Sequence, residues 1–346
     1  MYLKLEGTVR NLNLRSPLEV TYKETHAVKI TLRPPNSEEQ NTGQALENAM
    51  IITDLAIEPS STVRGAFLSL SRNEIPEGCT IPESERTLYV DEVGRLRSDR
   101  AIRMEYMPQP FRDFTHQLYE EMWDYTRRSA QVLRWRLAGT GPHNPFSIRG
   151  FSWSLDGNAW RPMPIEWRAI ATVLGIRSPV TPAEWNEVCS IVQDGKSEPL
   201  GHELYREAWD RRIDSPKSAL IVGIAALEVG FKNFVSELVP QTQWLLENLP
   251  SPPIHKMLKE YLPKIQTRNT INGEVLSPPS RVMEIIRNGV NKRNTAAHVG
   301  TATVTYDEVN EILLAVLDVL WMLDYYRGLN WALENMRPEI RGELAA

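Results

Sequence analysis

The chain has 346 residues, 42% of them hydrophobic, and a formal net charge of −5 at pH 7. This length is too great for one ordinary hydrophobic core and predicts two or three domains. The acidic balance excludes a protein that coats nucleic acid through bulk positive charge, although a local basic cleft is compatible with it. Two cysteines, Cys79 and Cys189, are too few for a disulfide framework or a cysteine-based metal site, so we expect reduced thiols.

The start of the chain lacks the apolar segment of a signal peptide. No window approaches the roughly 18 uncharged apolar residues of a membrane span. The sequence therefore predicts a cytoplasmic protein without membrane association.

Residues 1–105 show short alternating runs, such as 28–32 and 50–55, separated by clusters of proline, glycine, asparagine and serine. This period of two predicts β-strands. The polar segment 34–43 is expected to be a loop. We predict a β-rich domain here, with a possible role as a sensor or recognition module for a regulatory ligand or protein.

Residues 106–200 are expected to mix helices with a hairpin. Apolar residues fall at helical spacing from 110 to 137. Asp156-Gly157, flanked by aromatic residues, predicts a hairpin with a tight turn between 153 and 160. Thr181, a proline at the next position and Glu184 have the order of a helix start, and the helix is expected to continue through residue 192.

The region 201–335 is helical in pattern, so the chain as a whole is predicted to be α+β. Helices are expected at 216–239, at 252–262, from 280 to a C-cap at Gly300, and at 312–326 after a capping box of Thr305 and Glu308. Brief connections between such helices indicate an antiparallel helical bundle.

Arg293 and His298 stand near the end of the helix predicted from residue 280. A guanidinium can hold a phosphate, and an imidazole can move a proton near neutral pH, which together suit RNA cleavage without a metal. A second pair, Arg136 and His143, is separated by Gly139-Thr140-Gly141-Pro142, which breaks a helix and leaves those two side chains without a fixed relation.

The C-terminal region, about residues 200 to 330, resembles a HEPN domain, the helical ribonuclease fold of prokaryotic toxins and defence systems. Three features carry the resemblance: an Ala-Ala-Leu-Glu stretch ending at Glu228 in the first long helix, Arg293-Asn294 followed by His298 on an inner helix, and an apolar helix directly after. The asparagine after the arginine is the polar residue that the family's motif favours.

The resemblance implies a metal-independent endoribonuclease, without a cofactor, in which the substrate's own 2′-hydroxyl attacks the adjacent phosphate. His298 would move the protons, Arg293 would stabilise the charge of the phosphorane, and Asn294 would orient either one. In some family members an acidic residue at the place of Glu228 faces the catalytic pair. The family usually builds this site across a homodimer, and the role implied is that of a toxin or anti-phage defence effector.

Positions 293 and 298 lie about 140° apart around a regular helix, so both reach one substrate only if the helix ends or loosens between them. Both side chains are expected at a polar helix end, where substitution by alanine leaves folding nearly intact. The apolar 312–326 helix is expected to leave surface for a homodimer through the C-terminal domain.

Other interpretations stay open. The helical domain could be a non-catalytic HEPN module for dimerisation and interaction, with ligand binding by the N-terminal region. An enzyme site in the N-terminal half is a third alternative, although no phosphate loop, zinc pair or nucleophile elbow is present there. Arg127, Arg128, Arg134 and Arg136 could touch phosphates or form a solvated face.

Overall fold

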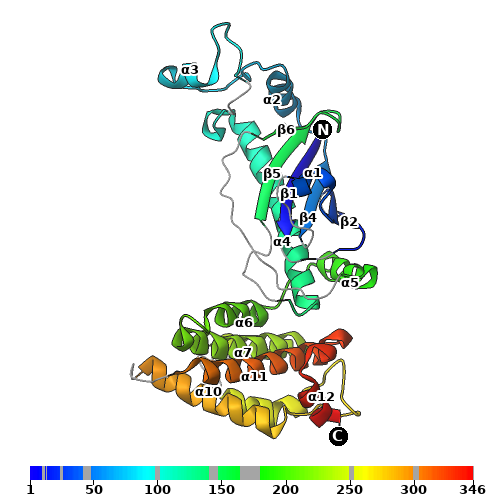
Figure 1. Ribbon diagram of the computed structural model, residues 1–346, viewed down its shortest axis with the longest axis vertical. Helices are drawn as coiled ribbons and strands as arrows, with labels where there is room; N and C mark the ends of the chain where they lie inside the picture. Colours follow the sequence, from blue (N-terminus) through cyan, green and yellow to red (C-terminus); the bar gives the residue numbers. More distant parts are fainter. Residues whose placement is uncertain are drawn as a thin grey trace. The chain divides into compact units, whose positions relative to one another are not determined.

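The computed structural model describes residues 1–9, 12, 14–23, 26–41, 48–97, 102–139, 147–163, 180–248, 253–298 and 304–345 (Figure 1). The chain divides into two compact units. Unit 1 comprises Met1–Leu133 and Asn144–Lys196, and unit 2 comprises Arg134–His143 and Ser197–Ala346. The hairpin and the helix predicted after residue 150 thus share unit 1 with the N-terminal strands.

Unit 1 is built on an antiparallel sheet of six strands in the order β2-β3-β4-β1-β5-β6. The strands are β1 (Tyr2–Val9), β2 (Leu18–Lys23), β3 (Ala27–Arg33), β4 (Ala49–Ala56), β5 (Ser147–Ser154) and β6 (Arg161–Pro162). Every second residue of β3 is buried, as the alternation at 28–32 predicted. With the helices of both units, this sheet confirms the predicted α+β class.

Helix α4 (Gln109–Arg136) packs against this sheet through its buried face. Tyr22 of β2 stacks on Tyr125 with 5.1 Å between ring centroids. Thr53 Oγ1 of β4 lies 2.6 Å from Thr126 Oγ1, and both residues are buried. The helix predicted at 110–137 is therefore confirmed, and its apolar face closes the core of unit 1.

Three other predictions for unit 1 had different outcomes. The capping box of Thr181 and Glu184 opens α5 (Pro182–Gln193), as expected. The hairpin is confirmed by the pairing of Trp153 with Arg161, but its connection is longer than a two-residue turn. The segment expected as a loop contains the short helix α1 (Ser37–Asn41), and α2 (Ser61–Ser71) was not predicted at all.

Unit 2 is helical. Its long helices are α6 (Leu200–Arg211), α7 (Pro216–Leu238), α10 (Ser280–His298) and α11 (Tyr306–Tyr326). Shorter segments are α8 (Gln243–Asn248), α9 (Ile254–Lys256), a π-helical turn Met257–Tyr261, 3₁₀ turns Leu262–Lys264 and Asn330–Asn335, and α12 (Pro338–Ala345). Figure 1 shows α7 among α6, α10 and α11, each of which it contacts.

Two pairs of consecutive helices in unit 2 run antiparallel. Gly201 at the start of α6 lies against the backbone of Gly230 in the second half of α7, where an added Cβ would come within 2.8 Å of the Gly230 Cα. On the other pair, Lys292 of α10 reaches Glu308 in the first turn of α11. The capping box of Thr305 and Glu308 at α11 is as predicted.

Among the described helices, α7 alone has the length and hydropathy of a membrane span, but 56% of the relevant window is buried inside the unit. Its glycines let α6 and α11 pack closely on it. This burial is the behaviour of a core helix.

The last turn of α4 belongs to unit 2 and carries buried charge. Arg134 and Arg206 both pair with Glu198, and the side chains of Arg134 and Glu198 are fully buried. Burial alone would raise the pKa of Glu198, but the two guanidiniums hold it below its usual range. Arg134 is therefore part of the core of unit 2, neither a phosphate contact nor part of a solvated face.

Candidate functional site

Helix α10 carries most of the residues predicted for the site. Its buried face contains Val282, Ile286, Gly289 and Ala296. Arg293 falls on this same stripe, four residues after Gly289 and three before Ala296. The expectation that Arg293 lies at a polar helix end is therefore wrong, because its side chain points toward the neighbouring helix and not into solvent.

Arg293 forms an ion pair with Glu228 of α7. The Nη2 group of Arg293 donates to Oε1 of Glu228, and the two side chains are only 18% and 13% exposed. The Nε of Arg293 is buried and has no hydrogen-bond partner among the described residues. Arg293 and Glu228, two of the four predicted catalytic residues, are 65 residues apart in sequence. The packing of α10 on α7 brings them together.

The Glu228 carboxylate is in an unfavourable place for a charge. Burial raises its pKa above the usual range, and the charges of Arg293 and Lys232 offset only part of this effect. A carboxylate in this state holds the guanidinium firmly but is easier to protonate than an exposed one. Glu228 is therefore able to orient Arg293 and to change charge more readily than a surface glutamate.

Asn294 is exposed, about 100° around α10 from Arg293. Position 298 is the last residue of α10, and the side chain of His298 lies outside the described part of the structure, as does Gly300. The helix continues without interruption from 293 to 298, so the predicted loosening between these positions is wrong. Positions 294 and 298 share one face, about 40° apart, whereas 293 and 298 stay about 140° apart.

Next to the motif, Lys292 Nζ donates to Glu308 Oε1 at 2.6 Å. The same carboxylate caps α11 by accepting from the backbone of Thr305. Lys292 and the Thr305 contacts lower the pKa of Glu308. This pair anchors the last turns of α10 to α11 and leaves Lys292 committed to a carboxylate.

Only one member of the second pair, Arg136 and His143, lies in the described part of the structure. Arg136 is the last residue of α4, with its guanidinium 5.0 Å from the ring centroid of Trp331, and His143 lies outside the described residues. Within the described ranges, no group of three or more histidine, cysteine, aspartate and glutamate side chains could hold a metal ion.

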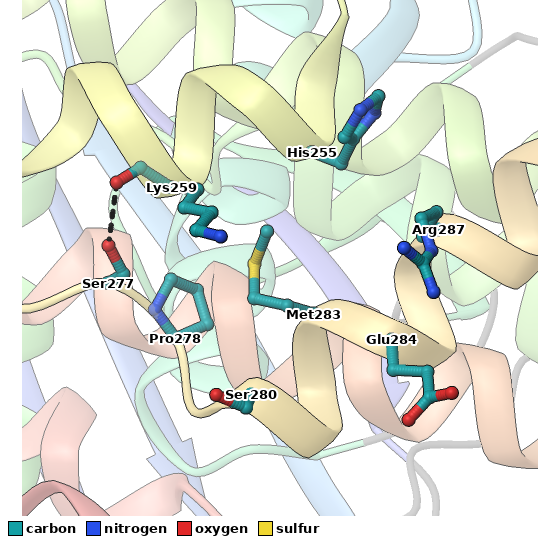
Figure 2. Close-up of a pocket in the computed structure, with 8 residues that line it drawn as sticks. All are labelled: His255, Lys259, Ser277, Pro278, Ser280, Met283, Glu284 and Arg287. Atoms are coloured by element: carbon teal, nitrogen blue, oxygen red, sulfur yellow. Dashed lines mark hydrogen bonds between the residues drawn. The ribbon is translucent and has the colours of Figure 1, made fainter.

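Sequence reasoning missed a pocket beside the first half of α10. It has a volume of about 580 Å³ and is lined by His255, Lys259, Glu284 and Arg287, among others (Figure 2). His255 and Lys259 come from one continuous segment, α9 and the π-helical turn that follows it directly, and Arg287 comes from α10, which begins 19 residues after that turn ends. Local periodicity could not have placed Arg287 beside the other two, because its approach depends on how α10 packs against that segment.

Comparison of the chain with family models, with curated proteins and with solved structures returned no match.

Proposed function

We propose that unit 2 is a metal-independent endoribonuclease of the HEPN type. The observation that carries the proposal is the contact between Arg293 and Glu228, which joins an arginine of the motif on α10 to the acidic residue expected on the first long helix. We attach to it the expectation that the protein acts in the cytoplasm as a toxin or anti-phage effector.

In the proposed reaction, His298 accepts the proton of the substrate's 2′-hydroxyl as the 2′-oxygen attacks the adjacent phosphorus. The bond from phosphorus to the 5′-oxygen breaks, and the leaving oxygen takes the proton back from the imidazolium of His298. The products are a 2′,3′-cyclic phosphate and a 5′-hydroxyl. Arg293, oriented by Glu228, stabilises the charge that builds on the phosphorane oxygens, and Asn294 offers an amide to the same strand.

The helical geometry makes a homodimer through unit 2 part of the proposal. Because α10 is continuous through position 298, positions 293 and 298 of one chain lie about 140° apart around the helix axis. A second copy related by a two-fold axis would bring the arginine of one chain near the histidine of the other. The buried face of α11 does not supply the surface for this dimer, because most apolar residues of this helix are buried inside unit 2.

The burial of the ion pair favours a second candidate function. An arginine that is 18% exposed and already bound to a carboxylate is suited to joining α7 to α10. In that case unit 2 is a non-catalytic HEPN-like interaction module, and unit 1 binds the ligand.

Purified protein incubated with RNA and EDTA separates these functions. The catalytic proposal expects cleavage that EDTA does not affect, cyclic phosphate ends, inert DNA, and loss of cleavage in His298→Ala. His116→Ala is the matched control, since His116 is exposed on α4 in unit 1. Wild-type activity in His298→Ala, a requirement for metal, or products with 5′-phosphates would refute the proposal.

A further inference from the structure

The pocket beside α10 carries an excess of positive charge that no ion pair among the described residues neutralises. Lys259 and Arg287 line it together with His255, and Glu284 supplies the opposing carboxylate. Figure 2 shows Lys259 on one side of the Met283 side chain and Arg287 of α10 on the other, with the His255 ring higher in the view and the Glu284 carboxylate turned away from the Lys259 amine. The pocket thus joins two permanent cations and an imidazole against a single acid.

Neither cation has an ion-pair partner among the described residues. This differs from Lys292 on the same helix, which pairs with Glu308. Lys259 and Arg287 are exposed side chains, so their positions are not fixed by the needs of the core. Cations that line a hollow without a protein carboxylate to bind are suited to an anion from outside.

The N-terminus of α10 adds to the field in this pocket. Ser280, the first residue of α10, lines the pocket, and the first turn of the helix holds no acidic residue. The first backbone N–H groups of a 19-residue helix have no intrahelical acceptor and favour a negative charge. Ser277 Oγ donates to the carbonyl of Lys259 at 3.1 Å, which ties the two walls of the pocket together.

The pocket and position 298 of the candidate site lie along one face of α10. Positions 287 and 298 are only about 20° apart around the helix and about 16 Å apart along it. Asn291 and Asn294 lie between them, both exposed and both able to donate hydrogen bonds. At roughly 3.4 Å per stacked nucleotide, this distance corresponds to on the order of five nucleotides.

We propose that the pocket formed by Lys259, Arg287 and the start of α10 binds a backbone phosphate of the RNA strand on which the candidate site acts. This rests on the proposed function and extends it by naming a second contact with the substrate. The occupant is a phosphodiester of a strand and not a free nucleotide, because the exposed polar face leads from the pocket to position 298.

Binding of RNA that cannot be cleaved tests the pocket apart from any activity. The probe is a fluorescent 2′-O-methyl RNA of about twelve nucleotides, long enough to cover both places. Arg287→Ala and Lys259→Ala should each weaken binding by about three- to tenfold and reduce the slope of log affinity against log salt by about 0.7. Glu284→Gln should strengthen binding by about twofold, since it removes the opposing charge.

The matched control is Arg281→Ala, which removes the same charge from an exposed position of the same helix outside the pocket lining. It should change binding by less than about twofold. Equal effects of Arg281→Ala and Arg287→Ala on RNA affinity would refute the pocket as a phosphate site, because the loss of affinity would then reflect only the loss of one positive charge. An RNA of about three nucleotides should lose the sensitivity to Arg287→Ala, because it cannot span the distance.

Further results distinguish a phosphate of an RNA strand from that of a free nucleotide. They also distinguish failure of the pocket proposal from failure of the proposed ribonuclease function. The first such result is that a mononucleotide binds tightly in a way that depends on Arg287, while RNA binding is unchanged by Arg287→Ala. This result would refute an RNA strand as the occupant of the pocket and would indicate a free nucleotide. Pocket-dependent RNA binding without any cleavage would support the pocket while the proposed function fails. Cleavage with no effect of the pocket variants on binding would overturn the pocket alone.

Discussion

Replacing Arg293 by alanine perturbs the pair that joins α10 to α7. It leaves the Glu228 carboxylate, 13% exposed, without its partner. Removing one partner of a fully buried pair costs about 3–5 kcal/mol, and exposed pairs contribute about 0–1 kcal/mol. For side chains 18% and 13% exposed, we expect a loss of about 1–3 kcal/mol, or roughly 3–10 °C in melting temperature.

The loss should depend on pH through Glu228. Its folded-state pKa is raised, mainly by burial, so folding favours the protonated form. The stability from protonation is complete below the unfolded pKa near 4.5 and disappears as the pH rises through the folded pKa. Without Arg293 the folded pKa rises further, so the deficit of Arg293→Ala should be small near pH 4.5 and should grow toward neutral pH.

The assay is denaturant unfolding followed by circular dichroism, for the wild type, Arg293→Ala, Glu228→Gln and the double variant. We expect a coupling energy of about 1–2 kcal/mol between the two sites. Arg281→Ala, on the exposed face of α10, should change stability by less than about 0.5 kcal/mol. Additivity of the two substitutions within about 0.3–0.5 kcal/mol, or a deficit that does not vary with pH, would refute the reasoning.

Three other predictions follow from the fold and the proposed site. In a 1:1 mixture of inactive Arg293→Ala and His298→Ala chains, shared sites should restore roughly a quarter of wild-type cleavage, and no recovery would place each site within one chain. Gly201→Ala should destabilise unit 2 by about 1–3 kcal/mol in thermal melts, because its Cβ would meet backbone; Gly65→Ala, which meets nothing within 4 Å, is the control. Burial raises the pKa of Cys189 to about 12, so mass spectrometry after alkylation near pH 8 should find Cys79 modified first, and equal rates would contradict this burial.

The sequence by itself determined what depends on neighbours along the chain. The capping boxes at Thr181 and Thr305 and the period of two in β3 involve residues within one turn or one strand, so their patterns are readable without a fold. The motif on α10 was also readable, because Arg293 and His298 occupy a single helix.

Tertiary structure alone decided which of these residues meet and how far they are from water. Arg134 is buried with Glu198, and Arg293 is bound to Glu228, although the sequence equally allowed solvated positions for both arginines. The basic pocket at Arg287 arises only where α10 packs against the separate segment that carries His255 and Lys259. The reason is physical: burial and the pairing of charges depend on contacts between residues far apart in sequence, which no local period encodes.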